Sequence, residues 1–154
     1  MLRNVTTTIW QTHSASDGPA MIFVDTSALY AILDRDDAGH PAARGTWTKW
    51  LEADDGPKLI ASNYILVETF ALLQSRLGLD AVRSLMDDLI PVLTIEWISP
   101  DDHQAAVAML RNANRRRLSL VDCSSFQIMR RLAVNEAFTF DKHFSEQGFR
   151  VLPG

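Results

Sequence analysis

Short apolar segments of strand length alternate along this chain with longer segments of helical pattern. The predicted strands are IFVD at 22–25, KLIAS at 58–62, TIEWI at 94–98 and AFTF at 137–140, with RVL at 150–152 as an edge strand. Strands separated by helices need crossover connections, which are almost always right-handed and place the strands parallel. The sequence therefore predicts an α/β fold with a mainly parallel central sheet flanked by helices.

The helix boundaries are predicted from capping and stop signals. Thr26 or Ser27 caps the first helix, Asn63 caps the third, Gly78 closes it, and Pro100 stands at the first position of the fifth. The predicted helices cover residues 27–35, 40–54, 64–78, about 80–90, 100–117 and 119–133.

Composition places the chain among single-domain proteins of a reducing compartment. Its 154 residues, 47% of them hydrophobic, are enough to bury one core without disulfides. The single cysteine, Cys123, cannot form an internal disulfide, and no Cys/His cluster of a structural zinc site accompanies it. No apolar run reaches the roughly 18 residues that cross a bilayer. We expect a cytoplasmic protein without a membrane partner, with residues 1–20 as a flexible leader and residues 21–154 as the domain.

The charge is unevenly distributed. The net charge is −4, but residues 111–131 contain six arginines and one acid, Asp122. This excess suits a polyanion on one side of the molecule. A solvated helix end, where cations are favoured, explains it equally well.

Four acids are expected to meet at one edge of the sheet. Asp25 ends the first strand, Glu68 lies in the helix after the second, Asp122 begins a helix and Asp141 follows the fourth strand. In a parallel sheet, strand carboxyl ends and the following helix N-termini share an edge, where ligands bind. The sequence therefore predicts an acidic site there.

Each acid taken singly has a structural explanation. Asp25 can cap the next helix, Asp122 fits a capping box with Ser119, and Asp141 fits a turn. Glu68 is harder to explain in this way, because it stands among apolar neighbours that would bury its charge. The agreement of all four on one edge favours a shared function.

Crowded carboxylates repel one another unless they share protons or bind a cation. An all-oxygen set suits Mg²⁺ or Mn²⁺, and such ions serve phosphate chemistry by activating water. The sequence predicts a phosphate-bearing substrate.

The ordered motifs FVDTSAL, NYILVETF, LSLVDCSSF and FTFDKHF resemble those of the PIN-domain ribonucleases, and most closely the VapC-type toxins of toxin–antitoxin pairs. The resemblance runs from about Met21 to the C-terminus. It implies a PIN-like three-layer fold and a metal-dependent endoribonuclease that uses metal-activated water. It also implies a toxin that dimerises and contacts its antitoxin through early helices.

The resemblance assigns roles to individual residues. Asp25, Glu68 and Asp122 match the family's metal-binding acids, and Asp141 matches its more variable fourth acid. Two small polar residues match supporting positions, namely Ser27 and Ser124. The leader departs from the family pattern, which places the first acid near the N-terminus.

Other residues receive structural interpretations. Cys123 is expected to be a small buried thiol, and His143 a surface loop histidine, although it could touch a phosphate. Trp47 and Trp50 are expected in the core or at an interface. The basic residues Arg115, Arg116 and Arg117 are hypothesised to hold the RNA backbone.

Two alternative functions stay open. The first is a catalytically silent PIN module that binds RNA or a protein partner. The second is a phosphatase of the haloacid-dehalogenase type, which requires a second aspartate two residues after Asp25, where this sequence has Ser27.

Overall fold

The computed structural model describes residues 18–154 and contains one five-stranded sheet. The predicted leader therefore lies almost wholly outside the described residues. The strands are β1 (Met21–Val24), β2 (Lys58–Ser62), β3 (Thr94–Glu96), β4 (Glu136–Phe138) and β5 (Arg150–Leu152). Their order is β3-β2-β1-β4-β5, and every pairing is parallel. The predicted α/β fold is confirmed, and the sheet is wholly parallel.

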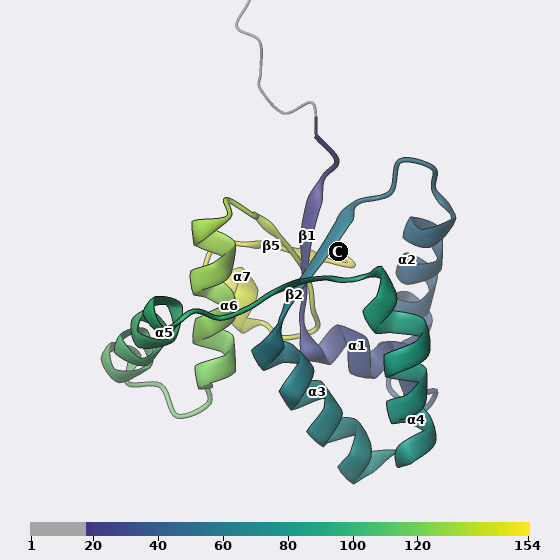
Figure 1. Cartoon of the computed structure of the whole chain (residues 1–154), viewed down its shortest axis with the longest axis horizontal. Helices are drawn as coiled ribbons and strands as arrows, with labels where there is room; N and C mark the ends of the chain where they lie inside the picture. The colour runs from purple at the N-terminus through teal and green to yellow at the C-terminus, as the bar shows by residue number, and fades with distance from the viewer. Residues whose placement is uncertain (1–17) are drawn as a thin grey trace, which may run out of the picture.

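Helices cover the sheet on both sides, as Figure 1 shows with α5 and α6 on one side of the central strands and α2 and α4 on the other. The α-helices are α1 (Thr26–Leu33), α2 (His40–Glu52), α3 (Asn63–Arg76), α4 (Leu79–Ser84), α5 (Pro100–Ala113), α6 (Leu120–Arg131) and α7 (His143–Glu146). A π-helical turn (Leu85–Leu89) and a 3₁₀ turn (Ile90–Val92) follow α4. Within residues 18–154, no helix combines the length and the apolar character that crossing a membrane requires.

The central strand β1 lies in the middle of the sheet because its residues are apolar on both faces. Phe23 and Val24 are fully buried, and Ile22 is nearly so. Parallel sheets covered by helices on both faces need such continuous apolar strands. Asp25 therefore follows a buried central strand directly, and this places its carboxylate at the carboxyl edge.

Three local predictions were wrong. Asp25, not Thr26 or Ser27, caps α1. Ser62, not Asn63, caps α3, since its hydroxyl accepts the Ile65 backbone N–H at 3.1 Å. Asn63 instead accepts the Ile98 backbone N–H at 2.8 Å and ties the segment after β3 to α3. Helix α5 ends at Ala113, before the arginines, because Asn114 adopts a left-handed conformation with φ 47°.

The short helix α7 has no counterpart among the predicted elements. It begins at His143, soon after β4, and its Phe144 is fully buried against Phe126 of α6 with ring centroids 5.1 Å apart. A helix of four residues has no periodicity to detect in a sequence. Its position matters because it carries His143 to the predicted acidic edge.

Candidate metal centre

Asp25 is held at the carboxyl end of β1 by three hydrogen bonds to one oxygen. Its Oδ2 accepts the Ser27 hydroxyl at 2.7 Å, the Thr139 hydroxyl at 2.9 Å and the Ser27 backbone N–H at 3.4 Å. The last bond caps α1, so the structural explanation of Asp25 is correct as far as it goes. Because all three bonds fall on Oδ2, the other oxygen is left for a different partner.

Asp122 also has two roles. It forms a capping box with Ser119 at the start of α6, in which each side chain accepts the other's backbone N–H at 3.0 Å. The residue is only 9% exposed, and its Oδ2 lies 3.9 Å from the ring Nδ1 of His143. The capping box fixes the direction of this carboxylate toward α7.

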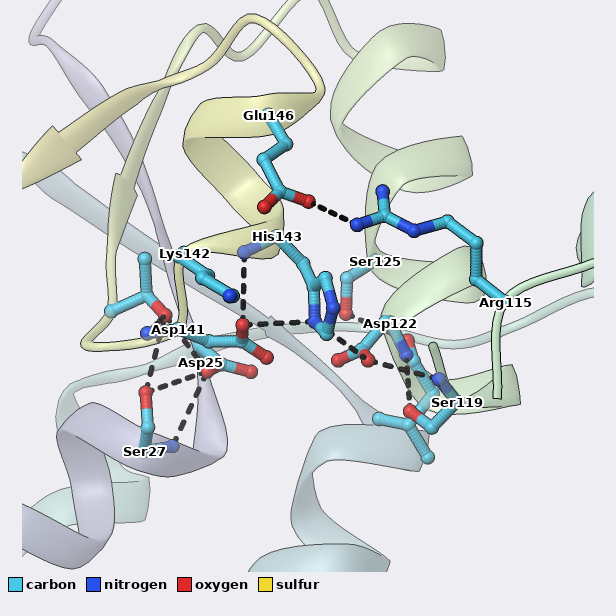
Figure 2. Close-up of polar contacts among 12 residues, drawn as sticks. Asp25, Ser27, Arg115, Ser119, Asp122, Ser125, Asp141, Lys142, His143 and Glu146 are labelled. Carbon is cyan, nitrogen blue, oxygen red and sulfur yellow. Dashed lines mark hydrogen bonds and ion pairs between the residues drawn. The ribbon is translucent and has the colours of Figure 1, made fainter. Parts of the chain in front are cut away.

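Asp141 lies in the loop between β4 and α7, where two backbone contacts position it. Its backbone N–H donates to the Thr139 hydroxyl, and its Oδ1 accepts the His143 backbone N–H, both at 2.9 Å. The same Oδ1 lies 3.0 Å from the His143 Nδ1. The structure thus gathers one donor atom each from Asp122, Asp141 and His143 within 4.8 Å of one another. Figure 2 shows the imidazole ring between the two carboxylates.

His143 is the site residue that sequence reasoning missed. We predicted a surface loop histidine, but the residue is buried, with only 9% of its surface exposed. The signal in the sequence was its place two residues after Asp141, which a backbone turn converts into contact. The apolar residue that follows, Phe144, anchors α7 in the core and thereby buries the imidazole.

Glu68 lies on α3 and is half-buried, within electrostatic range of the other acids. Burial raises the pKa of its carboxyl group, and the charges of Asp122 and Asp141 raise it further, while a hydrogen bond with Thr26 lowers it. Glu68 does not belong to the group of three donors that lie within 4.8 Å. Its carboxylate therefore approaches the acidic edge from α3 but lies outside the group formed by Asp122, Asp141 and His143.

Burial is the main influence on the acids of this edge, and repulsion among them adds a smaller effect. Burial raises the pKa of Asp25 from its ordinary 3.8 to about 6, against the lowering effect of its Ser27 and Thr139 hydrogen bonds. Burial also raises the pKa of Asp122, in spite of the capping bonds with Ser119. The charge of Asp141 raises the pKa of both groups. Four acids placed in this way favour a cation among them.

The two predicted supporting serines differ in position. The Ser27 hydroxyl contacts Asp25, lies 3.1 Å from the Thr139 hydroxyl and accepts the Phe140 backbone N–H at 2.9 Å, which joins the segment after β1 to the end of β4. The Ser124 hydroxyl instead donates to the Val121 carbonyl of its own helix at 2.7 Å. Thr139 also supports the acids, since its hydroxyl donates to Asp25 Oδ2 at 2.9 Å.

The arginines fall in the loop from α5 to α6. Arg115 pairs with Glu146 of α7 at 2.8 Å, beside His143 in Figure 2. Arg116 and Arg117 are exposed and form no ion pair within residues 18–154. Further along, at the end of α6, Arg131 binds Asp102 at 3.1 Å and Glu96 at 2.7 Å, so its charge is neutralised within the fold. The loop arginines come shortly before the Asp122 cap and border the acidic edge.

The donors present fit a divalent cation. Carboxylate oxygens from four segments of chain converge on one edge, and the buried Nδ1 of His143 has no hydrogen-bond partner within the described residues. An unsatisfied buried polar atom is costly, and a bound ion would satisfy it. Asp122, Asp141 and His143 would hold the ion from α6 and α7, with Asp25 and Glu68 facing it from β1 and α3.

Comparison with known proteins gives a family and close relatives. The model of the PIN domain matches residues 22–150. The 23S rRNA-specific endonuclease VapC20 of Mycobacterium tuberculosis, found in two strains, is 36% identical over 130 residues, which are 84% of this chain and 95% of the relative. The crystal structure of that VapC20, described as a sarcin–ricin loop cleaving toxin, aligns with a TM-score of 0.72 and 35% identity over 83% of this chain and 95% of the other.

A more distant structure shares the fold alone. FitAcB from Neisseria gonorrhoeae aligns with a TM-score of 0.62 at 13% identity, over 85% of this chain and 96% of the other. At this low identity the alignment shows only that the two proteins have the same fold.

The wholly parallel sheet, with acids at its carboxyl edge, and the match to the VapC20 structure show a PIN-type nuclease fold. This chain belongs to the PIN-domain family. The predicted resemblance to VapC-type toxins is confirmed, and with it the predicted class of toxin ribonuclease.

Proposed function

We propose that this protein is a metal-dependent endoribonuclease toxin that cleaves ribosomal RNA at a single exposed loop. The observation that carries the proposal is the convergence of Asp25, Glu68, Asp122 and Asp141 on one edge, joined there by His143. The complete acid set argues against a catalytically silent module. A phosphatase of the haloacid-dehalogenase type is disfavoured because Ser27, at the position of its second aspartate, serves as a hydrogen-bond donor to Asp25.

The substrate proposal rests on the relative. VapC20 is a 23S rRNA-specific endonuclease that cleaves the sarcin–ricin loop, and this chain matches 95% of its length. We propose the same loop as the target here. RNA loops expose single-stranded backbone and bases, which suits an exposed basic segment such as Arg116 and Arg117 next to an open acidic edge.

The residues have separable tasks in the proposed reaction. A divalent ion bound at the edge supplies an activated water and neutralises charge on the scissile phosphate. Asp122 and Asp141 would hold the ion in orientations that the capping box and the α7 turn fix. Asp25, whose Oδ2 is held by Ser27 and Thr139, would direct its other oxygen toward the ion or its bound water.

Nuclease assays with controlled metal content test the proposal. The purified protein, freed of any antitoxin, is expected to cut ribosomal RNA when Mn²⁺ or Mg²⁺ is present and to lose this activity in EDTA. Mapping of the cut ends is expected to place them in the sarcin–ricin loop. Undiminished cleavage in EDTA by repurified protein would refute the metal mechanism, and scattered cuts would refute the proposed target alone.

The loop arginines are proposed to hold phosphates. Replacing Arg115, Arg116 and Arg117 together by glutamine is expected to flatten the dependence of log affinity on log salt by about 0.7 for each phosphate of single-stranded RNA that an arginine neutralises. Arg115 should contribute least, because Glu146 already neutralises it. Filter binding across a salt series measures the slope, with Arg83→Gln on α4 as the control. An unchanged slope would make this loop an ordinary solvated helix end.

An antitoxin is proposed to occupy a groove on the early helices. A cavity of about 380 Å³ lies between α1, α2 and the π-helical turn, and its lining combines apolar residues such as Ile32 and Trp47 with the basic Arg35 and Arg44. A partner segment with apolar and acidic side chains would fit it. We also propose that the protein acts in the cytoplasm as a homodimer, as the family resemblance implies.

If the antitoxin occupies this groove, a substitution in the groove should abolish antitoxin binding without affecting RNA cleavage. Leu51 lines the groove and is 47% exposed, so Leu51→Glu should fold normally. The variant is expected to lose co-purification with the protein encoded beside it, since a buried like charge opposes an acidic segment. RNA cleavage by the isolated variant should persist. Retained co-purification would place the antitoxin elsewhere.

A further inference from the structure

We infer that the imidazole of His143 is a direct nitrogen ligand of the metal ion, and that it makes the site prefer first-row transition-metal ions to Mg²⁺. The inference rests on the proposed function, because it concerns the ion of the same site. It changes the expected donor set from oxygen alone to oxygen with nitrogen.

The first observation is the state of Nδ1. This atom is buried, and it has no hydrogen-bond partner within residues 18–154. It lies 3.0 Å from Asp141 Oδ1, but this contact lacks hydrogen-bond geometry. Buried nitrogen atoms in folded proteins normally have a partner. The lone pair of Nδ1 is therefore available to a metal ion.

The second observation is where the ring points. Nδ1 faces one oxygen donor from Asp122 and one from Asp141, and the three atoms lie within 4.8 Å of one another. Atoms that bind one ion at about 2 Å lie at most about 4 Å apart. Nδ1 meets this limit, since it lies 3.0 Å from Asp141 Oδ1 and 3.9 Å from Asp122 Oδ2. Figure 2 shows the ring directed between the two carboxylates from the α7 side.

The third observation is how firmly the ring is held. Phe144, the next residue, is fully buried and packs against Phe23 and Phe126. The backbone that carries His143 is therefore anchored in the core. A ligand held this way meets the ion at little cost in side-chain freedom.

The chemical consequence is a change in metal preference. Mg²⁺ is hard and takes oxygen ligands almost exclusively, whereas an imidazole nitrogen suits transition-metal ions. Affinity for a site with nitrogen rises from Mn²⁺ to Co²⁺ in the usual order of divalent metals. Removal of the nitrogen should therefore weaken Co²⁺ binding most, Mn²⁺ binding less and Mg²⁺ binding least.

Two variants separate the nitrogen from the rest of the site. His143→Asn places an amide oxygen near the position of Nδ1, so it replaces nitrogen by a harder donor at similar geometry. His103→Asn is the matched control, because His103 contacts Tyr64 on another part of the molecule. Titration calorimetry with Co²⁺, Mn²⁺ and Mg²⁺ is expected to show a fall in Co²⁺ affinity of about tenfold or more in His143→Asn alone, with Mg²⁺ affinity nearly kept.

Pulsed electron paramagnetic resonance of the bound Mn²⁺ gives a readout independent of cleavage. Wild type and His103→Asn should show modulation from a coordinated ¹⁴N nucleus, and His143→Asn should lack it. If His143→Asn does not fold, persistence of the signal in single Asn variants of His13, His40 and His103 assigns the nitrogen by elimination. Bound Mn²⁺ without ¹⁴N modulation would overturn the inference and leave the proposed function standing. Absence of any ion binding would overturn both.

Discussion

Asp122→Asn is expected to reduce RNA cleavage by roughly two orders of magnitude or more while the protein stays folded. The asparagine side chain can still accept the Ser119 backbone N–H, so the capping box at the start of α6 survives in part. The negative charge and one oxygen ligand are removed, and removal of one electrostatic stabiliser of a transition state typically costs this much. Cleavage rates with saturating Mn²⁺, next to circular dichroism spectra, measure both effects.

The chain contains its own control for Asp122. Ser99 and Asp102 repeat the same spacing at the start of α5, where the Ser99 hydroxyl accepts the Asp102 backbone N–H at 3.1 Å. The Asp102 carboxylate turns to Arg131 instead of to a metal site. Asp102→Asn should lower the melting temperature, because it removes the charge that pairs with Arg131, and should retain cleavage. An equal fall in cleavage in the two variants would mean that the Asp122 effect is one of folding.

This pair shows what the sequence could and could not predict about the site. Both aspartates fit the S-x-x-D pattern of a helix start. The local pattern cannot tell which of the two carboxylates pairs with an arginine of the same chain. Asp102 is neutralised by Arg131, which is 29 residues away in sequence. Within residues 18–154, Asp122 has no such arginine and meets other acids instead. The topological rule that parallel strands end at one edge predicts Asp122 as a site residue and not Asp102, since that rule concerns the whole sheet.

The site residues that the sequence did not reveal have a common physical origin. Thr139 and His143 reach the site through turns next to Asp141, and their roles depend on side-chain directions that short irregular segments leave unmarked in the sequence. Ser124 was assigned by resemblance, but a hydroxyl within a helix can bond the carbonyl of the preceding turn, and this one does. Strands and long helices were predictable because burial imposes a period on them, whereas the loops that complete the site carry none.

Asp25→Asn is expected to raise the stability of the metal-free protein and to abolish most of its activity. Asp25 is buried and its pKa is raised to about 6, so at pH 7 the folded protein carries a charge that burial and its acidic neighbours disfavour. An amide removes the charge and can keep the bonds from Ser27 and Thr139 to its oxygen. A shift from 3.8 to about 6 corresponds to roughly 3 kcal/mol of penalty. Because an amide accepts weaker bonds than a carboxylate, the net gain should be on the order of 1 kcal/mol.

The pH dependence of this gain has a definite sign. A carboxyl group whose pKa is higher in the folded state contributes stability below its unfolded pKa of 3.8, and this contribution disappears as the pH rises through about 6. In EDTA, the melting temperatures of wild type and Asp25→Asn should therefore converge near pH 4 and separate up to pH 6, with the variant higher. At pH 7 the difference should be complete.

Added Mn²⁺ distinguishes a metal ligand from a helix cap. If Asp25 faces the ion, the wild-type protein should gain more stability from saturating Mn²⁺ than the variant gains, because binding stabilises in proportion to affinity for the folded state. A pure capping role for Asp25 predicts equal metal shifts and equal or slightly lower stability of the variant in EDTA, since asparagine caps a helix nearly as well as aspartate. Thermal melts of both proteins at pH 7, with EDTA and with Mn²⁺, decide between the two roles. An unchanged metal shift would remove Asp25 from the metal centre, and the ion would then rest on α6 and α7 through Asp122, Asp141 and His143.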